Sequence, residues 1–431
     1  MRLRTLWLTA ALLLAGTQAS LHAQPVANLQ ARPVADVQAA ASAEKAPLLD
    51  TLRDLVNVES GSKDPQGLAQ LAALIRDRLA QLGGQAQLVG ADEVYRMEDT
   101  PEQIGAMVHA QFKGQGSSKL MLIAHMDTVY LRGMLKDQPF RVDGDRAYGL
   151  GILDDKQGIA LILHTVAMLN KLNFRDYGTL TVLVNGDEEI SSPASRSLIT
   201  RLAADQDAVL SFEGGGEQGH LRLATSGIGS AYLSVEGRAS HAGSAWSQGV
   251  NALTELSHQV LQLSDLTQPA KGLSLNWTVS QAGTNRNVIP ALAGAQADAR
   301  ALRLSDFDEL QATLQQRVKQ QRVPDAKVQL RFEIRRPPLE ATTASRALGA
   351  RAVAVYGELG LPLRVLDVPT GGGTDAAFAA VKARGPVIEG LGLSGAGSHS
   401  NMAEYVKLDS IVPRLYLSTR LIMDLSGAKA R

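Results

Sequence analysis

Histidine, aspartate and glutamate residues of this sequence stand where they could hold metal ions. His125 and Asp127 lie two residues apart at the end of the apolar run KLMLIAHMDTVY. In an extended strand such residues point to the same face. The Asp127 carboxylate could then hold one ring nitrogen of His125 and leave the other for a metal. A surface histidine beside a turn aspartate would give the same pattern.

Further acidic residues stand where apolar runs end or where a helical pattern begins: Asp154, Asp155, Asp187, Glu188, Glu189 and Glu213. Neighbouring carboxylates repel one another unless they are solvated or share a cation. Taken singly, these residues would also suit helix caps and solvated turns. With His125 and the loop residue His399, they supply the two imidazoles and three carboxylates that a dinuclear zinc site requires.

Alternating strands and helices set the positions of these residues. The runs 119–130, 179–189 and 208–216 have the length of buried strands, and Lys156–Leu172 repeats its apolar residues at helical spacing. This alternation predicts an α/β fold with a mostly parallel sheet flanked by helices. Such sheets carry their sites at the carboxyl ends of the strands, so we expect the candidate ligands at one edge, with His399 folding back to it.

The pattern changes between residues 226 and 337. GSAYLSVEGRAS alternates as a strand does, and a helical pattern at Ala252–Leu263, two strand-like runs, a second helix and the strand KVQLRFEIRR follow it. This order predicts a small α+β domain inserted into the first one. The first domain would then consist of residues 45–225 and 338–426.

The N-terminus has the features of an export signal. Within residues 1–23, Arg2 and Arg4 precede the apolar run Leu6–Gly16, which is too short to span a bilayer. We expect signal cleavage, a flexible tail over residues 24–44 and a periplasmic or secreted protein with no membrane attachment. A membrane anchor is the alternative interpretation.

The composition limits the partners and the metal chemistry. Lys plus Arg and Asp plus Glu both number 43, so the formal net charge is zero and the basic surface typical of nucleic-acid binding is not expected. Hydrophobic residues make up 45% of the 431 residues, enough for the cores of two or three domains. The chain contains no cysteine, so histidine and carboxylate groups must supply any zinc ligands.

Several motifs resemble one family in order and spacing: AHMDTVYLRG, the DDK turn, NGDEE, LSFE, ATSGIG, ASHAG, NRNVIP, TGGGTDAA and HSNMAEYV. From about Lys45 to Ser426 the sequence resembles the M20 family of metallopeptidases, and within it the bacterial glutamate carboxypeptidases. The resemblance implies a zinc-aminopeptidase-like catalytic domain and makes the inserted domain a dimerisation domain. It therefore implies a homodimer.

The resemblance also implies a role for each candidate residue. His125 and Glu213 would hold one zinc, Glu189 and His399 the other, and Asp154 would bridge the two. Glu188 would be the general base and Asp127 the partner of His125. The Asp154–Asp155 peptide bond is expected to be cis. Co²⁺ or Mn²⁺ could replace Zn²⁺ at such ligands.

Residues of the inserted domain and its surroundings would meet the substrate. The resemblance implies that His241 reaches the site of the partner subunit and stabilises the oxyanion. Asn287 and Arg300 would bind the terminal carboxylate, since a guanidinium group is suited to it. Arg336 and Gly372 are further candidates, although the glycine could simply serve its turn.

These roles imply a carboxypeptidase that hydrolyses the amide bond to a C-terminal amino acid, glutamate above all, in N-acylated or folate-like substrates. A hydroxide bridging the metals would attack the carbonyl, with Glu188 moving the proton. His220 stands where the glutamate carboxypeptidases have a lysine, which bears on side-chain preference. A dipeptidase, aminoacylase or deacetylase of the same family, and a non-catalytic binding protein, are the alternatives.

Overall fold

The computed structural model describes residues 32–369, 371–400 and 404–427. The predicted signal peptide, residues 1–23, lies outside them. The prediction of a flexible tail over residues 24–44 is wrong from Ala35 onward, because helix α1 spans Ala35–Val56. Val37 and Ala41 are buried and belong to the same core as the rest of the helix, so contacts with distant parts of the chain order this segment.

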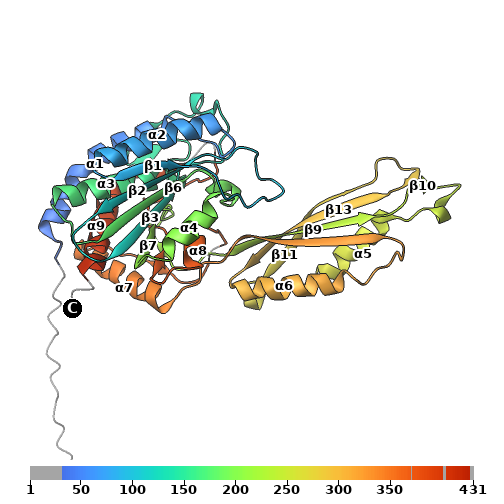
Figure 1. Ribbon diagram of the computed structural model, residues 1–431. Helices are drawn as coiled ribbons and strands as arrows, with labels where there is room; N and C mark the ends of the chain where they lie inside the picture. The colour runs from blue at the N-terminus through green and yellow to red at the C-terminus, as the bar shows by residue number, and fades with distance from the viewer. Residues whose placement is uncertain (1–31, 370, 401–403, 428–431) are drawn as a thin grey trace, which may run out of the picture.

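A six-stranded sheet forms the centre of the larger part of the molecule (Figure 1). Its order is β1 (Gln85–Val89), β2 (Met107–Lys113), β6 (Thr179–Asn185), β3 (Lys119–His125), β7 (Ala208–Ser211) and β16 (Val387–Ile388). The pairs β6–β3, β3–β7 and β7–β16 are parallel, whereas β1 and β2 add an antiparallel edge. The predicted α/β class with a mostly parallel sheet is confirmed.

Side chains that alternate along these strands pack into two separate hydrophobic cores. In β3, Leu120 and Leu122 belong to the larger core, whereas Met121 and Ile123 belong to the smaller one. The larger core includes α1, α2 (Pro65–Gln81), α3 (Gln157–Lys171), α7 (Thr343–Glu358) and α9 (Ile411–Gly427). The smaller core includes α4 (Ser195–Ala203) and α8 (Ala376–Ala380). Both faces of the sheet are therefore covered, and the strands can be apolar on both sides.

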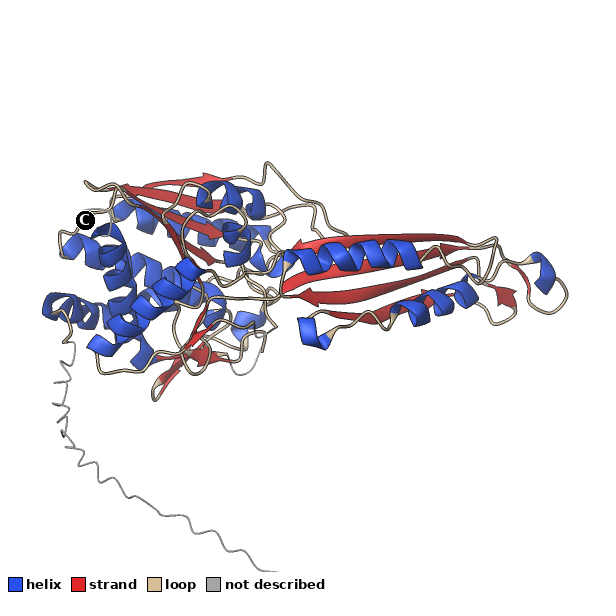
Figure 2. Ribbon diagram, turned by 90° about the horizontal axis from the view of Figure 1, so that it is seen from below, coloured by secondary structure: helices blue, strands red, loops and turns tan. Residues whose placement is uncertain are grey.

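A second unit projects from the first and is built on an antiparallel sheet (Figure 1). Its strands are β11 (Ser274–Ala282), β13 (Leu292–Ala301), β9 (Gly227–Glu236) and β14 (Lys327–Arg336), in this order. Helices α5 (Ala252–Leu263) and α6 (Leu304–Arg317) lie along one face of the sheet (Figure 2). Alternate residues of β9, such as Ala231 and Leu233, are buried towards these helices. All these elements lie within the predicted inserted segment.

Short strands complete the two units. The far end of the second unit carries β10 (Ser240–His241) paired with β12 (Val288–Ile289), well away from the first sheet (Figure 1). In the first unit, β8 (Leu221–Arg222) pairs with β15 (Val365–Leu366). A small sheet is formed by β4 (Arg141–Asp143), β5 (Arg146–Tyr148), β17 (Gly395–Ala396) and β18 (Tyr405–Lys407). Among the described residues, no helix has both the length and the apolar content needed to cross a membrane.

Candidate metal centre

The candidate ligands gather at the carboxyl ends of the parallel strands. His125 is the last residue of β3 and pairs with Asn185 of β6, after which the chain turns through Glu188 and Glu189. Glu213 follows β7 by two residues. Because the three strands are parallel neighbours, their ends meet at the same sheet edge, as the sequence pattern predicted.

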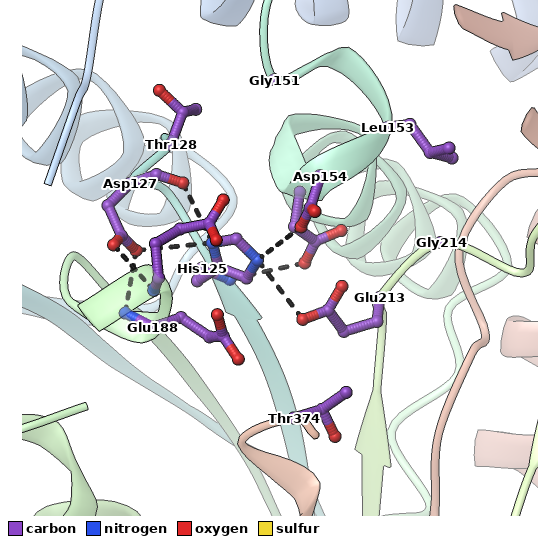
Figure 3. Close-up of polar contacts among 12 residues, drawn as sticks. His125, Asp127, Thr128, Gly151, Leu153, Asp154, Glu188, Glu213, Gly214 and Thr374 are labelled. Atoms are coloured by element: carbon purple, nitrogen blue, oxygen red, sulfur yellow. Dashed lines mark hydrogen bonds and ion pairs between the residues drawn. The ribbon is translucent and has the colours of Figure 1, made fainter. Parts of the chain in front are cut away.

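Asp154 lies between the two histidines. His125 Nε2 is 3.0 Å from Asp154 Oδ1 and 3.3 Å from Glu213 Oε1. His399 Nε2 is 3.2 Å from Asp154 Oδ2 and 3.2 Å from Glu189 Oε2. Figure 3 shows Asp154 and Glu213 both pointing towards the His125 ring. The two oxygens of Asp154 therefore face different histidines, which is the geometry required of a carboxylate that bridges two cations.

The main chain of Asp127 fixes the tautomer of His125. His125 Nδ1 is 3.0 Å from the Asp127 carbonyl oxygen and 3.4 Å from its Oδ1. A carbonyl oxygen can only accept a hydrogen bond, so Nδ1 carries the hydrogen and Nε2 presents its lone pair to Asp154 and Glu213. The Asp127 carboxylate instead accepts the backbone N–H groups of Glu188 and Glu189, at 3.0 and 3.1 Å. Asp127 thus positions the acidic turn as well as the histidine.

Glu188 differs from the other acidic residues because an arginine holds it. Arg336 Nη1 lies 2.8 Å from Glu188 Oε1, and Arg336 Nη2 donates to the Glu188 carbonyl oxygen at 2.8 Å. The same guanidinium group lies 3.0 Å from Asp375 Oδ1. One carboxylate oxygen of Glu188 is thereby occupied by the guanidinium group. Burial raises the pKa of Glu188 well above its usual range, and Arg336 opposes this rise.

The electrostatics of the cluster favour added positive charge. Burial raises the pKa of Glu189 to about 7, and the nearby Asp154 carboxylate adds to this effect. Hydrogen bonds to Asp154 and Glu189 raise the pKa of His399 to about 10. Carboxylates packed this closely stabilise a cation between them. Two groups of donors each lie within 4.8 Å of one another: His125, Glu188 and Glu213; and Asp154, Glu189 and His399.

The turn that presents Asp154 is held by Glu404. The Glu404 carboxylate accepts the backbone N–H groups of Gly151, Leu153 and Asp154 at 2.8 to 3.1 Å, and the Tyr130 hydroxyl donates to it. Burial raises the pKa of Glu404 to about 7. The Asp154–Asp155 peptide bond is cis, as the resemblance implied.

A cavity of ≈ 480 Å³ opens beside these residues. It is lined by four of the five predicted metal ligands, namely Asp154, Glu189, Glu213 and His399, and by Glu188. Of the predicted substrate-binding residues, Arg300, Arg336 and Gly372 also line it. Arg300 is paired through two 2.9 Å contacts with Asp298. The volume is typical of a small-molecule site.

His241 and Asn287 lie elsewhere. His241 belongs to β10 at the far end of the second unit, and the Asn287 carbonyl oxygen accepts the neighbouring Ala242 N–H at 2.9 Å. The exposed His241 ring accepts the N–H groups of Gly243 and Ser244 at Nδ1, both at 3.1 Å. A neutral ring therefore carries its hydrogen on Nε2, as a donor. Within one chain the structure does not bring these residues to the cavity.

Comparisons with known proteins agree with this architecture. The sequence matches the profile described as Peptidase family M20/M25/M40 over residues 121–424. The chain belongs to this family. Carboxypeptidase G2 of Pseudomonas sp. (strain RS-16) is 45% identical to the peptidase over 393 residues, or 90% of this chain and 92% of that protein. A succinyl-diaminopimelate desuccinylase of Corynebacterium glutamicum is 28% identical over 292 residues, or 62% and 72% of the two chains.

Solved structures share the fold at lower identity. The aminopeptidase PepT from Bacillus cereus has a TM-score of 0.71 at 17% identity, covering 88% of the peptidase and 98% of that chain. An M20 family metallo-carboxypeptidase from Sulfolobus solfataricus has a TM-score of 0.68 at 15% identity, with coverages of 88% and 99%. The family makes the chain a metallopeptidase, and these neighbours confirm its two-part fold.

The structure adds residues to the site that reasoning from the sequence missed. Glu404 and Asp375 stand in the motifs HSNMAEYV and TGGGTDAA, so the motifs themselves were a signal. Arg222 lines the cavity of the peptidase and Glu389 lies behind it, yet neither belongs to a recognised motif. Their partners lie far away in the sequence, so spacing alone could not have indicated them.

Proposed function

We propose that this peptidase is a dinuclear zinc carboxypeptidase that releases a C-terminal amino acid, glutamate above all, from N-acylated or folate-like substrates. The observation that carries the proposal is Asp154, whose two oxygens lie 3.0 and 3.2 Å from the histidines on either side. The 45% identity to carboxypeptidase G2 supports the choice of a carboxypeptidase.

The donor set fits two zinc ions. His125 and Glu213 on one side, and Glu189 and His399 on the other, offer nitrogen and oxygen donors, and Asp154 contacts both histidines. Glu188 is close enough to coordinate as well, but its ion pair with Arg336 favours the role of a base. Bound zinc would lower the pKa of water and polarise the scissile carbonyl.

The protein's own groups move the protons and orient the site. Glu188 accepts the proton of the attacking water and returns it to the leaving nitrogen. Arg336 holds Glu188 in place by contacts to both its side chain and its carbonyl oxygen. Asp127 keeps His125 in the tautomer whose Nε2 is free. The terminal carboxylate of the substrate would meet Arg300, with Gly372 at the wall of the same cavity.

We further propose that the active assembly is a homodimer in which His241 and Asn287 serve the site of the partner subunit. The support is the position of His241. The resemblance implies that this residue stabilises the oxyanion, yet it lies at the far end of the second unit, away from the cavity of its own chain. With Nδ1 occupied by two N–H groups, His241 presents an outward Nε2–H, which is the group an oxyanion needs. The export signal over residues 1–23 would place this dimer in the periplasm or outside the cell.

A hydrolysis assay of the zinc-loaded protein tests the function. We expect turnover of N-acyl-glutamate to exceed that of N-acyl-aspartate, N-acyl-leucine and free dipeptides. Preference for free dipeptides would favour a dipeptidase, and preference for N-acyl groups on other amino acids, such as N-acyl-leucine, would favour an aminoacylase or deacetylase. A folded wild type that hydrolyses none of these substrates would favour the non-catalytic binding protein. Replacing His125 by alanine should lower the metal content below two ions per chain, as measured by elemental analysis.

A further inference from the structure

Three arginines line the cavity, and their partners differ. Arg336 is buried and paired with Glu188 and Asp375. Arg300 is held in a two-point contact by Asp298. These two guanidinium groups therefore have carboxylate partners within hydrogen-bonding distance inside the protein.

Arg222 lacks such a partner. Its Nη1 donates to the Gly214 carbonyl oxygen at 3.1 Å, and among the described residues its nearest ion-pair contact is Glu389 Oε1 at 4.0 Å. That distance exceeds a hydrogen bond, and Glu389 Oε1 makes no hydrogen bond within the described part of the chain. A half-buried guanidinium group with free donors beside a cavity is suited to a carboxylate of the ligand.

The backbone fixes the direction of this side chain. Arg222 N donates to the Glu389 carbonyl oxygen at 2.8 Å, and Glu389 N donates back to the Arg222 carbonyl oxygen at 3.0 Å. Arg222 also ends β8, which pairs with Val365–Leu366. Gly214, whose oxygen accepts from Arg222, directly follows the candidate ligand Glu213. The guanidinium group is therefore held next to the candidate metal centre by a paired strand.

We propose that Arg222 binds the side-chain carboxylate of an acidic C-terminal residue of the substrate. The inference rests on the proposed carboxypeptidase function, in which Arg300 meets the terminal carboxylate through Nη1, the nitrogen that Asp298 does not contact. Arg300 comes from β13 of the second unit, whereas Arg222 comes from β8 of the first, so the cavity has cations on two separate walls. Two separated cations match a dicarboxylic amino acid better than one with an apolar side chain.

Arg222 is also the permanent cation of the segment that contains His220. His220 and Arg222 lie two residues apart in an extended segment, and both are partly buried. Burial and the neighbouring Arg222 lower the pKa of His220, so the imidazole is not the cation of this segment. The permanent charge of Arg222 does not depend on pH in the working range. Selectivity for an acidic residue is thus compatible with the histidine.

The test compares N-acetyl-L-glutamate with N-acetyl-L-glutamine, which has nearly the same shape without the charge. In the zinc-loaded Arg222→Met variant we expect kcat/KM for the glutamate substrate to fall by about 10- to 100-fold, the loss of a charge-assisted hydrogen bond, with the glutamine substrate changed by no more than about twofold. Arg222→Lys should retain part of the preference. An equal fall for both substrates, or an unchanged ratio, would overturn the assignment.

Two controls separate this inference from the function on which it rests. Arg346→Met removes an exposed arginine paired with Asp367 outside the cavity and should leave both rates unchanged. Calorimetric binding of L-glutamate and L-glutamine needs no turnover. If the wild type hydrolyses neither substrate, the carboxypeptidase proposal fails, whereas weaker glutamate binding by Arg222→Met would still support the role of Arg222. Equal affinity of the wild type for L-glutamate and L-glutamine would refute the role of Arg222.

Discussion

His125 at the sheet edge and His241 at the far tip of the second unit, the β10–β12 pair, have opposite hydrogen-bonding patterns at Nδ1. At the edge, His125 is almost wholly buried, and its Nδ1 donates to the Asp127 carbonyl oxygen. At the tip, His241 is exposed, and its Nδ1 accepts two backbone N–H groups. The first ring offers a lone pair at Nε2, and the second offers a hydrogen there. The main chain alone thus makes one imidazole suited to a cation and the other suited to an anion.

The surroundings of the two regions differ as well. The edge lies where three parallel strands end between two buried cores, so the strands that carry its side chains are held by packing on both faces. The tip is a two-residue pairing of β10 with β12, and Trp246 beside it has 67% of its surface exposed. The edge brings together a full set of candidate metal ligands, whereas the tip acquires a role only if another molecule covers it.

The largest expected effect comes from removing the base at the edge. Glu188→Gln should lower kcat by about 10²- to 10⁴-fold, because the amide cannot accept the proton of the attacking water. The metal content should stay near that of the wild type, since none of the five candidate ligands is changed. Rates from a stopped assay and elemental analysis of the same sample give both values.

Glu102→Gln, at an exposed acidic residue, is the matched control and should change neither value. If Glu188→Gln lost its metal together with its activity, Glu188 would be a ligand rather than the base. Its closeness to His125 and Glu213 makes this the sharpest alternative.

At the tip, His241→Ala should lower kcat by about 10²- to 10³-fold, the loss typical of one oxyanion donor, with metal content unchanged. Mixing this variant with Glu188→Gln separates a role in the same chain from a role in the partner. Random exchange of subunits should restore about a quarter of wild-type activity, because half the dimers pair one intact base with one intact tip. No recovery after exchange would refute the shared site.

Much of the sheet edge followed from the sequence because each part had a local signal. Apolar runs gave β3, β6 and β7, and the acidic residues directly after them gave the candidate ligands. The resemblance then assigned roles that local patterns left open. His399 comes from a distant loop, and only the motif around it linked it to the edge.

Other features had no local signal. Residues 35–44 read as a tail because their alanine and glutamine pattern is weak, yet they are helical where α1 packs against α3 and α9. The proposed role of Arg222 depends on its position beside the cavity, and that position is set by backbone pairing with Glu389, 167 positions later in the sequence. Contacts between distant segments determine such positions, and they are absent from the spacing of residues along the chain.

A smaller effect is expected from loosening the turn that carries Asp154. Glu404→Gln keeps the shape of the side chain but replaces a carboxylate that accepts three backbone N–H groups. Metal affinity should fall by about 10- to 100-fold, as is typical when a residue supporting a ligand is changed. Competition with a chelator measures it, and activity at saturating zinc should largely recover. A loss of activity that zinc cannot restore would assign Glu404 a different role.

The smallest effect on the fold is expected at the tip. Trp246→Ala should change the free energy of unfolding by no more than about 0.5 kcal/mol, because an exposed side chain has little packing to lose. If the tip contacts no other subunit, Trp246→Ala should also leave kcat/KM unchanged. A tip that inserts into a neighbouring subunit would bury this ring, so kcat/KM should fall and the dimer should weaken in analytical ultracentrifugation. Phe212→Ala, at a fully buried ring near the edge, is the contrasting control and should cost about 3–5 kcal/mol of stability.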